Sequence, residues 1–306
     1  MRSWTTIITL LGLAAIPATT QAETGRQFEA EIGFGQLDED WLLTTRLGFL
    51  WFDEVSAVGC RDLEMDRCVA PVKVALNAPV RFEIIDEVPS DNDIVRSEDW
   101  NDPGDFLRFV RFLQYGEKYQ PLYARTGELG AVALGHGTIT NGYLNTITTG
   151  DFSPGIEAAV NTTYGGLHLV LDDYTHPSVL GLRGHVRPWG FGDRGWWHRF
   201  ALGVSAVTDF RAPLSVAAGD PVRGEPDVPE ATSFTVAGVD LELTPVDNDT
   251  VELLTYADVN FALGVGGHLG ATLRVAFGED WSASLRAEGR LLGSNYLPDY
   301  FCPLYH

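Results

Sequence analysis

Positively charged residues are scarce in this chain of 306 residues. Lysine and arginine together number 21, against 42 aspartates and glutamates, which gives a formal net charge of −21. Nucleic-acid binding needs a basic surface to match the phosphates, so the composition argues against a nucleic-acid partner. It suits an exported protein whose acidic loops face the medium, where they would attract divalent cations.

A long apolar helix is also missing from the body of the chain. The only strongly apolar stretch lies within Met1–Ala22, where Arg2 precedes Ile7–Ile16 and a small-residue site, Thr20-Gln21-Ala22, follows. This run of about ten residues is too short for a membrane span of about 20 and predicts a cleaved secretory signal peptide. We therefore expect residues 23–306 to form one domain that is either soluble outside the cytoplasm or enters a membrane as strands.

Motifs for catalysis and for cofactor binding are lacking. No Gly-x-Ser-x-Gly sequence is present, and the glycines around His136 are not followed by the Lys-Ser/Thr of a phosphate loop. Asp91-Asn92-Asp93 would suit calcium, but no EF-hand spacing completes it. The sequence predicts no enzyme, no cofactor and no defined metal site, with His136 interpreted as a polar residue packed against a bend or wall rather than a catalytic base.

The chain has only three cysteines. Cys60 and Cys68 bracket a polar loop, and in an oxidising compartment they predict a disulfide, with two free thiols as the alternative. Cys302 is left unpaired and has no assigned role.

Glycine and aromatic residues are plentiful, and apolar residues alternate with polar ones. Between Tyr256 and Leu291 the odd positions are apolar or small, whereas charged and polar side chains occupy even positions. A period of two indicates strands with one apolar and one polar face, and Gly278-Glu279-Asp280 indicates a turn between two of them. Similar alternation predicts about twelve strands in total, joined by alternately short and long connections, as in outer-membrane barrels.

Two segments interrupt this pattern. The region near 87–116 is first acidic and proline-containing, which predicts a loop or short-helix insertion, with a helix or a strand over Phe106–Tyr115. Pro213–Pro229 is also acidic and proline-rich and predicts an external loop. If the apolar faces meet lipid, the polar faces line a lumen, and their charges would set its ion preference. The resulting lumen or ion-path candidates are Arg183, Arg187, Asp258, Arg274, Arg286, Glu288 and Arg290.

Two short segments carry a resemblance. Gly135-His136-Gly137-Thr138-Ile139 with the following Asn141–Asn145, and Tyr296–Phe301 with nearby Tyr305, resemble segments of poorly characterised, porin-like outer-membrane β-barrel proteins of Gram-negative bacteria. The resemblance implies location and fold and assigns no residue roles. Because such barrels close with an alternating strand that ends in an aromatic residue, it also predicts that a chain ending in Leu304-Tyr305-His306 lacks its last strands.

These observations predict an all-β protein, an antiparallel transmembrane β-barrel in the outer membrane, with lipid, small solutes and ions as partners. The expected function is a porin-like channel or a surface structural barrel with a charged lumen. The alternative is a secreted soluble β-sandwich or lectin-like domain, in which Trp189, Trp196 and Trp197 would stack on sugars.

Overall fold

The computed structural model describes residues 25–37, 40–58, 69–85, 94–100, 103–146, 152–190, 198–217, 227–248, 250–277, 281–303 and 305. The predicted signal peptide, the Cys60–Cys68 disulfide, the Asp91–Asp93 segment, the 278–280 turn and two of the three tryptophans, Trp196 and Trp197, lie outside these ranges. Cys302 is a free thiol.

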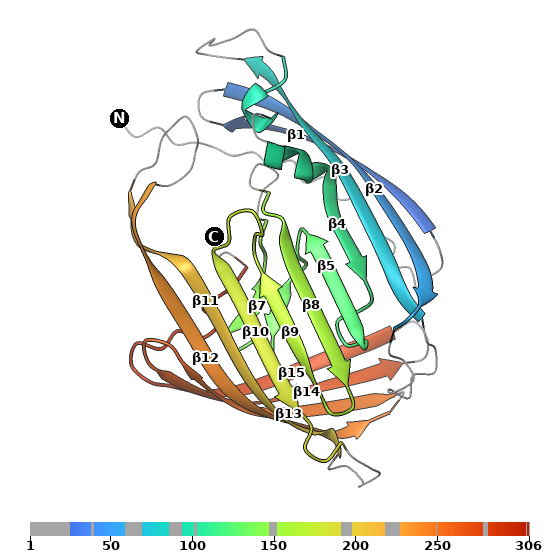
Figure 1. Ribbon diagram of the computed structural model, residues 1–306, viewed down its shortest axis with the longest axis vertical. Helices are drawn as coiled ribbons and strands as arrows, with labels where there is room; N and C mark the ends of the chain where they lie inside the picture. Colours follow the sequence, from blue (N-terminus) through green and yellow to red (C-terminus); the bar gives the residue numbers. More distant parts are fainter. Residues whose placement is uncertain are drawn as a thin grey trace.

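One large antiparallel sheet dominates the described chain, which confirms the predicted all-β class (Figure 1). Its 13 strands follow one another across the sheet in chain order, except that the two-stranded hairpin β6 (Val132–Leu134) and β7 (Thr140–Tyr143) is left out. The strands are β1 (Gly25–Leu37), β2 (Asp40–Ser56), β3 (Val69–Ile85), β4 (Val110–Tyr115), β5 (Leu122–Gly127), β8 (Gly155–Thr162), β9 (Gly165–Leu171), β10 (Val179–Val186), β11 (Phe200–Ala217), β12 (Asp227–Asp247), β13 (Val251–Phe261), β14 (Val265–Phe277) and β15 (Trp281–Leu292).

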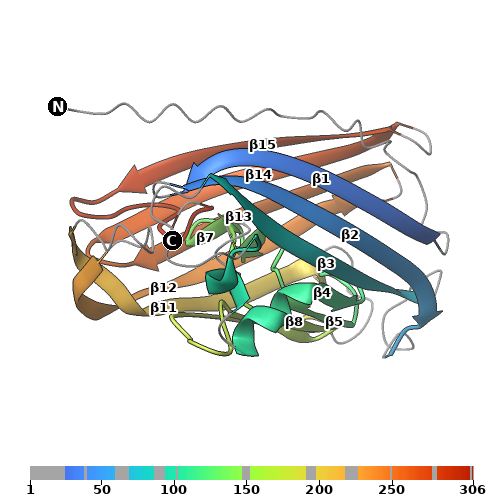
Figure 2. The same cartoon turned by 90° about the horizontal axis from the view of Figure 1, so that it is seen from above.

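The sheet curls strongly but does not close. β1 and β15 are its two edges, and no pairing joins them in the described residues. Since every neighbouring pair is antiparallel and the strand number is odd, β1 and β15 run in the same direction. Figure 2 shows β7 and the C-terminus inside the curl, between β13–β15 and β11–β12. We call the concave side of the sheet the inner face.

The outer face is apolar and exposed. On β14 and β15, Leu269, Leu285 and Leu291 are 69%, 67% and 84% exposed. Their neighbours in sequence point to the inner face, since side chains alternate along a strand. Rows of large exposed apolar side chains continue on β8–β13, for example Val204 and Val239. In the described ranges, no helix has the length and apolar character needed to cross a membrane.

The inner face is mixed. At one level it contributes valines from β9, β10, β11 and β12 to an apolar cluster, in which they pack against the β6–β7 hairpin and Phe301. At other levels it carries buried polar side chains, including Glu157, Asp240, Asp258 and His268. The hairpin therefore fills part of the interior with a small hydrophobic core, and the polar residues surround it.

The two interruptions differ from the sequence expectation. Within 87–116, two 3-10 helices, η2 (Ser97–Trp100) and η3 (Pro103–Phe109), precede β4, so residues 106–115 form part of a short helix followed by a strand. The predicted external loop at 213–229 is shorter than expected, because β11 continues to Ala217 and β12 begins at Asp227.

Pro79 lies at an open stretch of β3. It pairs with Arg46 of β2 without a register shift, whereas the pairing of β3 with β4 stops at Leu76. Proline has no N–H to donate, so it fits where the neighbouring strand has ended. The predicted open edge is confirmed, and the alternative, a bulge at this position, is wrong.

Candidate functional site

The two segments singled out in the sequence meet inside the sheet. Asn141 N donates to Phe301 O at 3.2 Å, and Phe301 N donates to Ile139 O at 3.2 Å. Asp299 N donates to Thr138 O at 3.1 Å, and Thr140 and Phe301 form a parallel bridge. The C-terminal segment thus runs beside β7 and holds the hairpin from one side.

Side-chain hydrogen bonds fix both ends of this unit. Asn145, just after β7, accepts from Leu129 N at 2.8 Å and donates to the carbonyls of Gly127 and Asp172, each at 3.0 Å. The Tyr305 hydroxyl donates to Asp209 of β11 at 2.5 Å. Burial and this acceptor raise the pKa of Tyr305, so that its hydroxyl keeps its proton.

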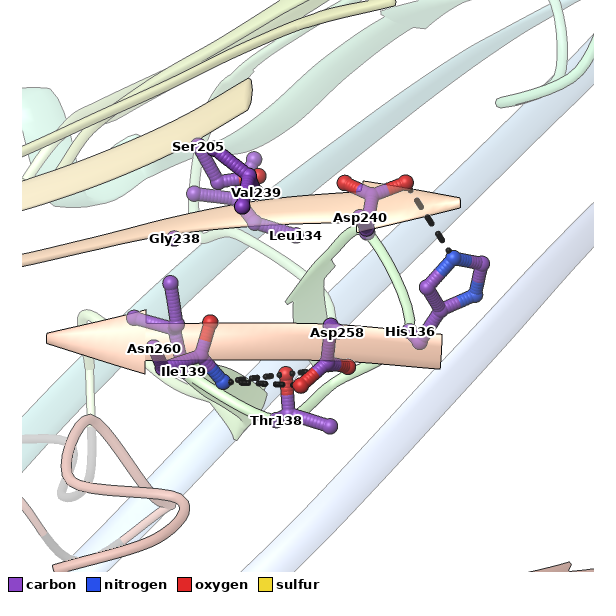
Figure 3. Close-up of a pocket in the computed structure, with 11 residues that line it drawn as sticks. Leu134, His136, Thr138, Ile139, Ser205, Gly238, Val239, Asp240, Asp258 and Asn260 are labelled. Carbon is purple, nitrogen blue, oxygen red and sulfur yellow. Dashed lines mark hydrogen bonds and ion pairs between the residues drawn. The ribbon is translucent and has the colours of Figure 1, made fainter. Parts of the chain in front are cut away.

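Asp258 of β13 binds the tip of the hairpin. Its Oδ2 accepts a hydrogen bond from Thr138 Oγ1 at 3.0 Å, and its Oδ1 lies 2.6 Å from His268 Nδ1 on β14. Asn260 Nδ2 donates to Thr138 Oγ1 at 2.9 Å and to Asp258 Oδ1 at 3.1 Å, as Figure 3 shows. All four side chains are buried.

Asp240, the cross-strand partner of Asp258, forms a second contact with the tip. Its Oδ1 lies 3.3 Å from His136 Nε2 (Figure 3). The same oxygen accepts a hydrogen bond from Arg183 Nη2 of β10 at 2.8 Å. The His136 ring also stacks on Tyr256, with centroids 4.2 Å apart and planes 6° from parallel. His136 is therefore a wall contact of the tip, as the sequence analysis interpreted it.

Arg286, Glu288 and Arg290 gather on the inner face of β15. Arg286 Nη2 lies 2.5 Å from Glu288 Oε2 and donates to the Tyr256 hydroxyl at 2.8 Å. Arg290 contacts Glu288 and also pairs with Asp299 of the C-terminal segment at 3.1 Å. Tyr256 thus links this cluster to His136.

Glycines on the inner face make room for these large side chains. Gly270 pairs with Tyr256 across β13 and β14, and a Cβ at Gly270 would collide with the Tyr256 ring. The same holds for Gly203, which pairs with Asp240 and lies under its carboxylate. The glycines therefore let polar and aromatic side chains lie flat on the wall.

A small recess, partly open to solvent, lies between the tip and the wall. It is lined by Leu134, Gly135, His136, Thr138, Ile139, Ser205, Gly238, Val239, Asp240, Asp258 and Asn260. Both carboxylates already have donor partners, so the arrangement holds the hairpin against the wall. Among the described residues, no group of three or more His, Cys, Asp or Glu side chains is placed to hold a metal ion.

The sequence-predicted site residues are brought together in part. Arg183 and Asp258 both lie at the recess or beside it, and Arg286, Glu288 and Arg290 form the neighbouring cluster. Arg187 lies just beyond β10 and donates to Thr162 O at 2.8 Å. Arg274 is separate from the others, half-exposed and paired with Glu252 of β13 at 2.9 Å.

Sequence reasoning did not include several polar residues of the inner face in the candidate site. Asp240, Asn260 and His268 occupy polar positions in the alternation, which is the signal that could have found them. Glu157, which is fully buried, accepts from Tyr123 at 2.9 Å and contacts Lys118 and His168 at 2.8 and 3.0 Å.

No family model, curated protein or solved structure matches this chain.

Proposed function

We propose that this protein is a porin-like β-barrel of the bacterial outer membrane, to which its signal peptide directs it. Its interior is partly filled and charged, and it passes small solutes or ions. The observation that carries the proposal is the distribution of side chains between the two faces of the sheet. Large apolar residues are exposed on the outer face, whereas charged and amide side chains are buried on the inner face. Membrane barrels have this arrangement, since their outer surface meets acyl chains.

A soluble β-sandwich would require the opposite arrangement. Its apolar rows would pack against a second sheet, about 10 Å away. In this chain Phe261, Leu269 and Leu291 are 49%, 69% and 84% exposed, and the small sheet β6–β7 lies on the inner side. Exposed apolar rows of this extent favour lipid as the partner.

Fractionation tests the membrane assignment. The protein should remain in outer-membrane pellets after a carbonate wash, and detergent should extract it. Folded barrels resist SDS until heated, so unheated and heated samples should migrate differently on a gel. Release by the carbonate wash, with a single gel position, would contradict the proposal.

Ion selectivity tests the interior. Changing Arg286 and Arg290 to glutamate replaces two positive charges with two negative ones on the inner face of β15, so we expect the reversal potential in a salt gradient across a planar bilayer to shift towards cation selectivity. The control is Arg286→Lys with Arg290→Lys, which keeps both charges. Equal reversal potentials for the two double variants would count against an ion path along β15.

A further inference from the structure

Two unlike sets of contacts hold the β6–β7 hairpin. Its base is apolar, because Val132 and Tyr143 are buried in the cluster that includes Val207 and Phe301. Its tip, Gly135–Thr138, meets the wall through polar side-chain contacts, with His136 at Asp240 and Thr138 at Asp258. The base is therefore held by packing that water cannot replace, whereas the tip makes contacts that water and ions can replace.

The backbone of the tip lies beyond the strand ladder. The pairing of β6 with β7 ends at Leu134 and Thr140, and the turn itself is closed by Gly137 N donating to Leu134 O at 3.1 Å. Gly135 and Gly137 have φ of 59° and 74°, a region that glycine adopts without steric cost. The tip can therefore change conformation without breaking the β6–β7 pairing or the apolar base, but release of Thr138 also breaks the hydrogen bond from Asp299 N to Thr138 O.

The docked tip leaves a buried donor without a partner. Arg183 Nε has no hydrogen-bond acceptor among the described residues, although the same guanidinium binds Asp240 through Nη2. A Cβ at Gly135 would lie 3.0 Å from this Nε, so the tip covers it directly. A buried unpaired donor costs about 1–3 kcal/mol, and water reaches it once the tip moves away. This cost offsets part of the stability that the tip contacts give to the docked conformation.

We propose that Gly135–Thr138 is a latch that closes the interior when docked on Asp240 and Asp258 and opens a solute path past these two carboxylates when released. This inference rests on the proposed function. The apolar base and the C-terminal segment keep the hairpin in place while the latch moves. The latch therefore acts as a gate on the path and leaves the fold unchanged.

The first experiment weakens the latch. His136→Ala removes the contact with Asp240 and the stack on Tyr256, and the loss of about 1.4 kcal/mol of tip contact would raise the open fraction about tenfold. We expect a corresponding rise in single-channel open probability in planar bilayers. The matched control is His176→Ala, because His176 lies in an exposed turn between β9 and β10. Its open probability should equal that of the unaltered protein.

The second experiment locks the latch. A Cβ at Gly135 would lie 3.7 Å from Ser205 Oγ, so Gly135→Cys with Ser205→Cys places two thiols close enough to bridge. Oxidation should abolish the open state and reduction should restore it, whereas Gly135→Cys alone, which carries the same backbone strain at a φ of 59°, should respond to neither treatment.

The outcomes separate the two proposals. A protein that inserts and shows heat-modifiable migration, but conducts equally in the His136→Ala, His176→Ala and oxidised double-cysteine forms, overturns the latch and leaves the membrane role standing. A protein that fails to insert overturns both. Increased opening in His136→Ala together with reversible closure by the disulfide supports the latch.

Discussion

Replacing Leu269 with arginine should reveal which solvent the outer face meets. Leu269 lies near the middle of β14, is 69% exposed and pairs with Ala257 and Gly289. In water, a substitution at such an exposed position changes the free energy of unfolding by within about 0.5 kcal/mol. Near the bilayer midplane, an arginine on the lipid face of a barrel costs about 2–4 kcal/mol. The two environments therefore predict clearly different effects.

Leu263 provides the matched control. It is 72% exposed but lies in the turn between β13 and β14, outside the paired strands. Near a membrane interface an arginine costs about 0–1 kcal/mol, so Leu263→Arg should be almost neutral. The difference between the two variants isolates the effect of depth from the general effect of adding a charge.

Urea titration of protein folded into lipid vesicles measures both variants. With a slope of about 1–3 kcal/mol/M, a loss of about 3 kcal/mol lowers the unfolding midpoint by about 1 M or more. Equal midpoints for Leu269→Arg and Leu263→Arg, both close to that of the unaltered protein, would refute the argument that lipid covers the outer face.

Two further predictions concern the inner face, each measured as a free energy of unfolding. Gly270→Ala should destabilise by about 1–3 kcal/mol because its Cβ collides with the Tyr256 ring. Gly289→Ala, whose nearest atom would be Leu269 O at 3.9 Å, should be tolerated. If Gly270→Ala were tolerated as well as Gly289→Ala, the Tyr256 ring would be free to move aside. Glu157→Gln should cost about 1.5–3 kcal/mol because it removes the charge that Tyr123 and Lys118 contact. Glu117→Gln, in an exposed pair, should cost about 0–1 kcal/mol. A neutral Glu157→Gln would mean that the buried carboxylate contributes no net stability.

Much of the sheet follows from local pattern. The alternation at residues 72–84 predicts a strand that the structure extends to Val69–Ile85. The alternation after Tyr256 separates the exposed leucines of β14 and β15 from the charged residues between them, because a period of two fixes the face of every side chain once the strand is paired. The alternation does not give the orientation of the sheet, since the pattern alone does not say which face turns inward.

The interior hairpin could not be predicted in this way. Its contacts join Thr140 to Phe301 and Thr138 to Asp258, and no short-range period links segments so distant in sequence. In the sequence the residues of the tip are noticeable as glycines around a histidine and as part of a segment that resembles outer-membrane barrels, and neither feature gives their contacts. Asp240 and Tyr256 become important only after the sheet brings them beneath that histidine.

The odd number of strands determines the nature of any seam between the edges of the sheet. In an up-and-down sheet with an even number of strands, the two edge strands run antiparallel. A ladder between them would have the same alternating hydrogen-bond pattern as the other ladders of the sheet. With the 13 strands of the described residues, β1 and β15 point the same way, so a ladder between them would be parallel, with slanted and evenly spaced bonds that are slightly weaker per residue. In the described residues no ladder joins β1 and β15, so the sheet is open along this line.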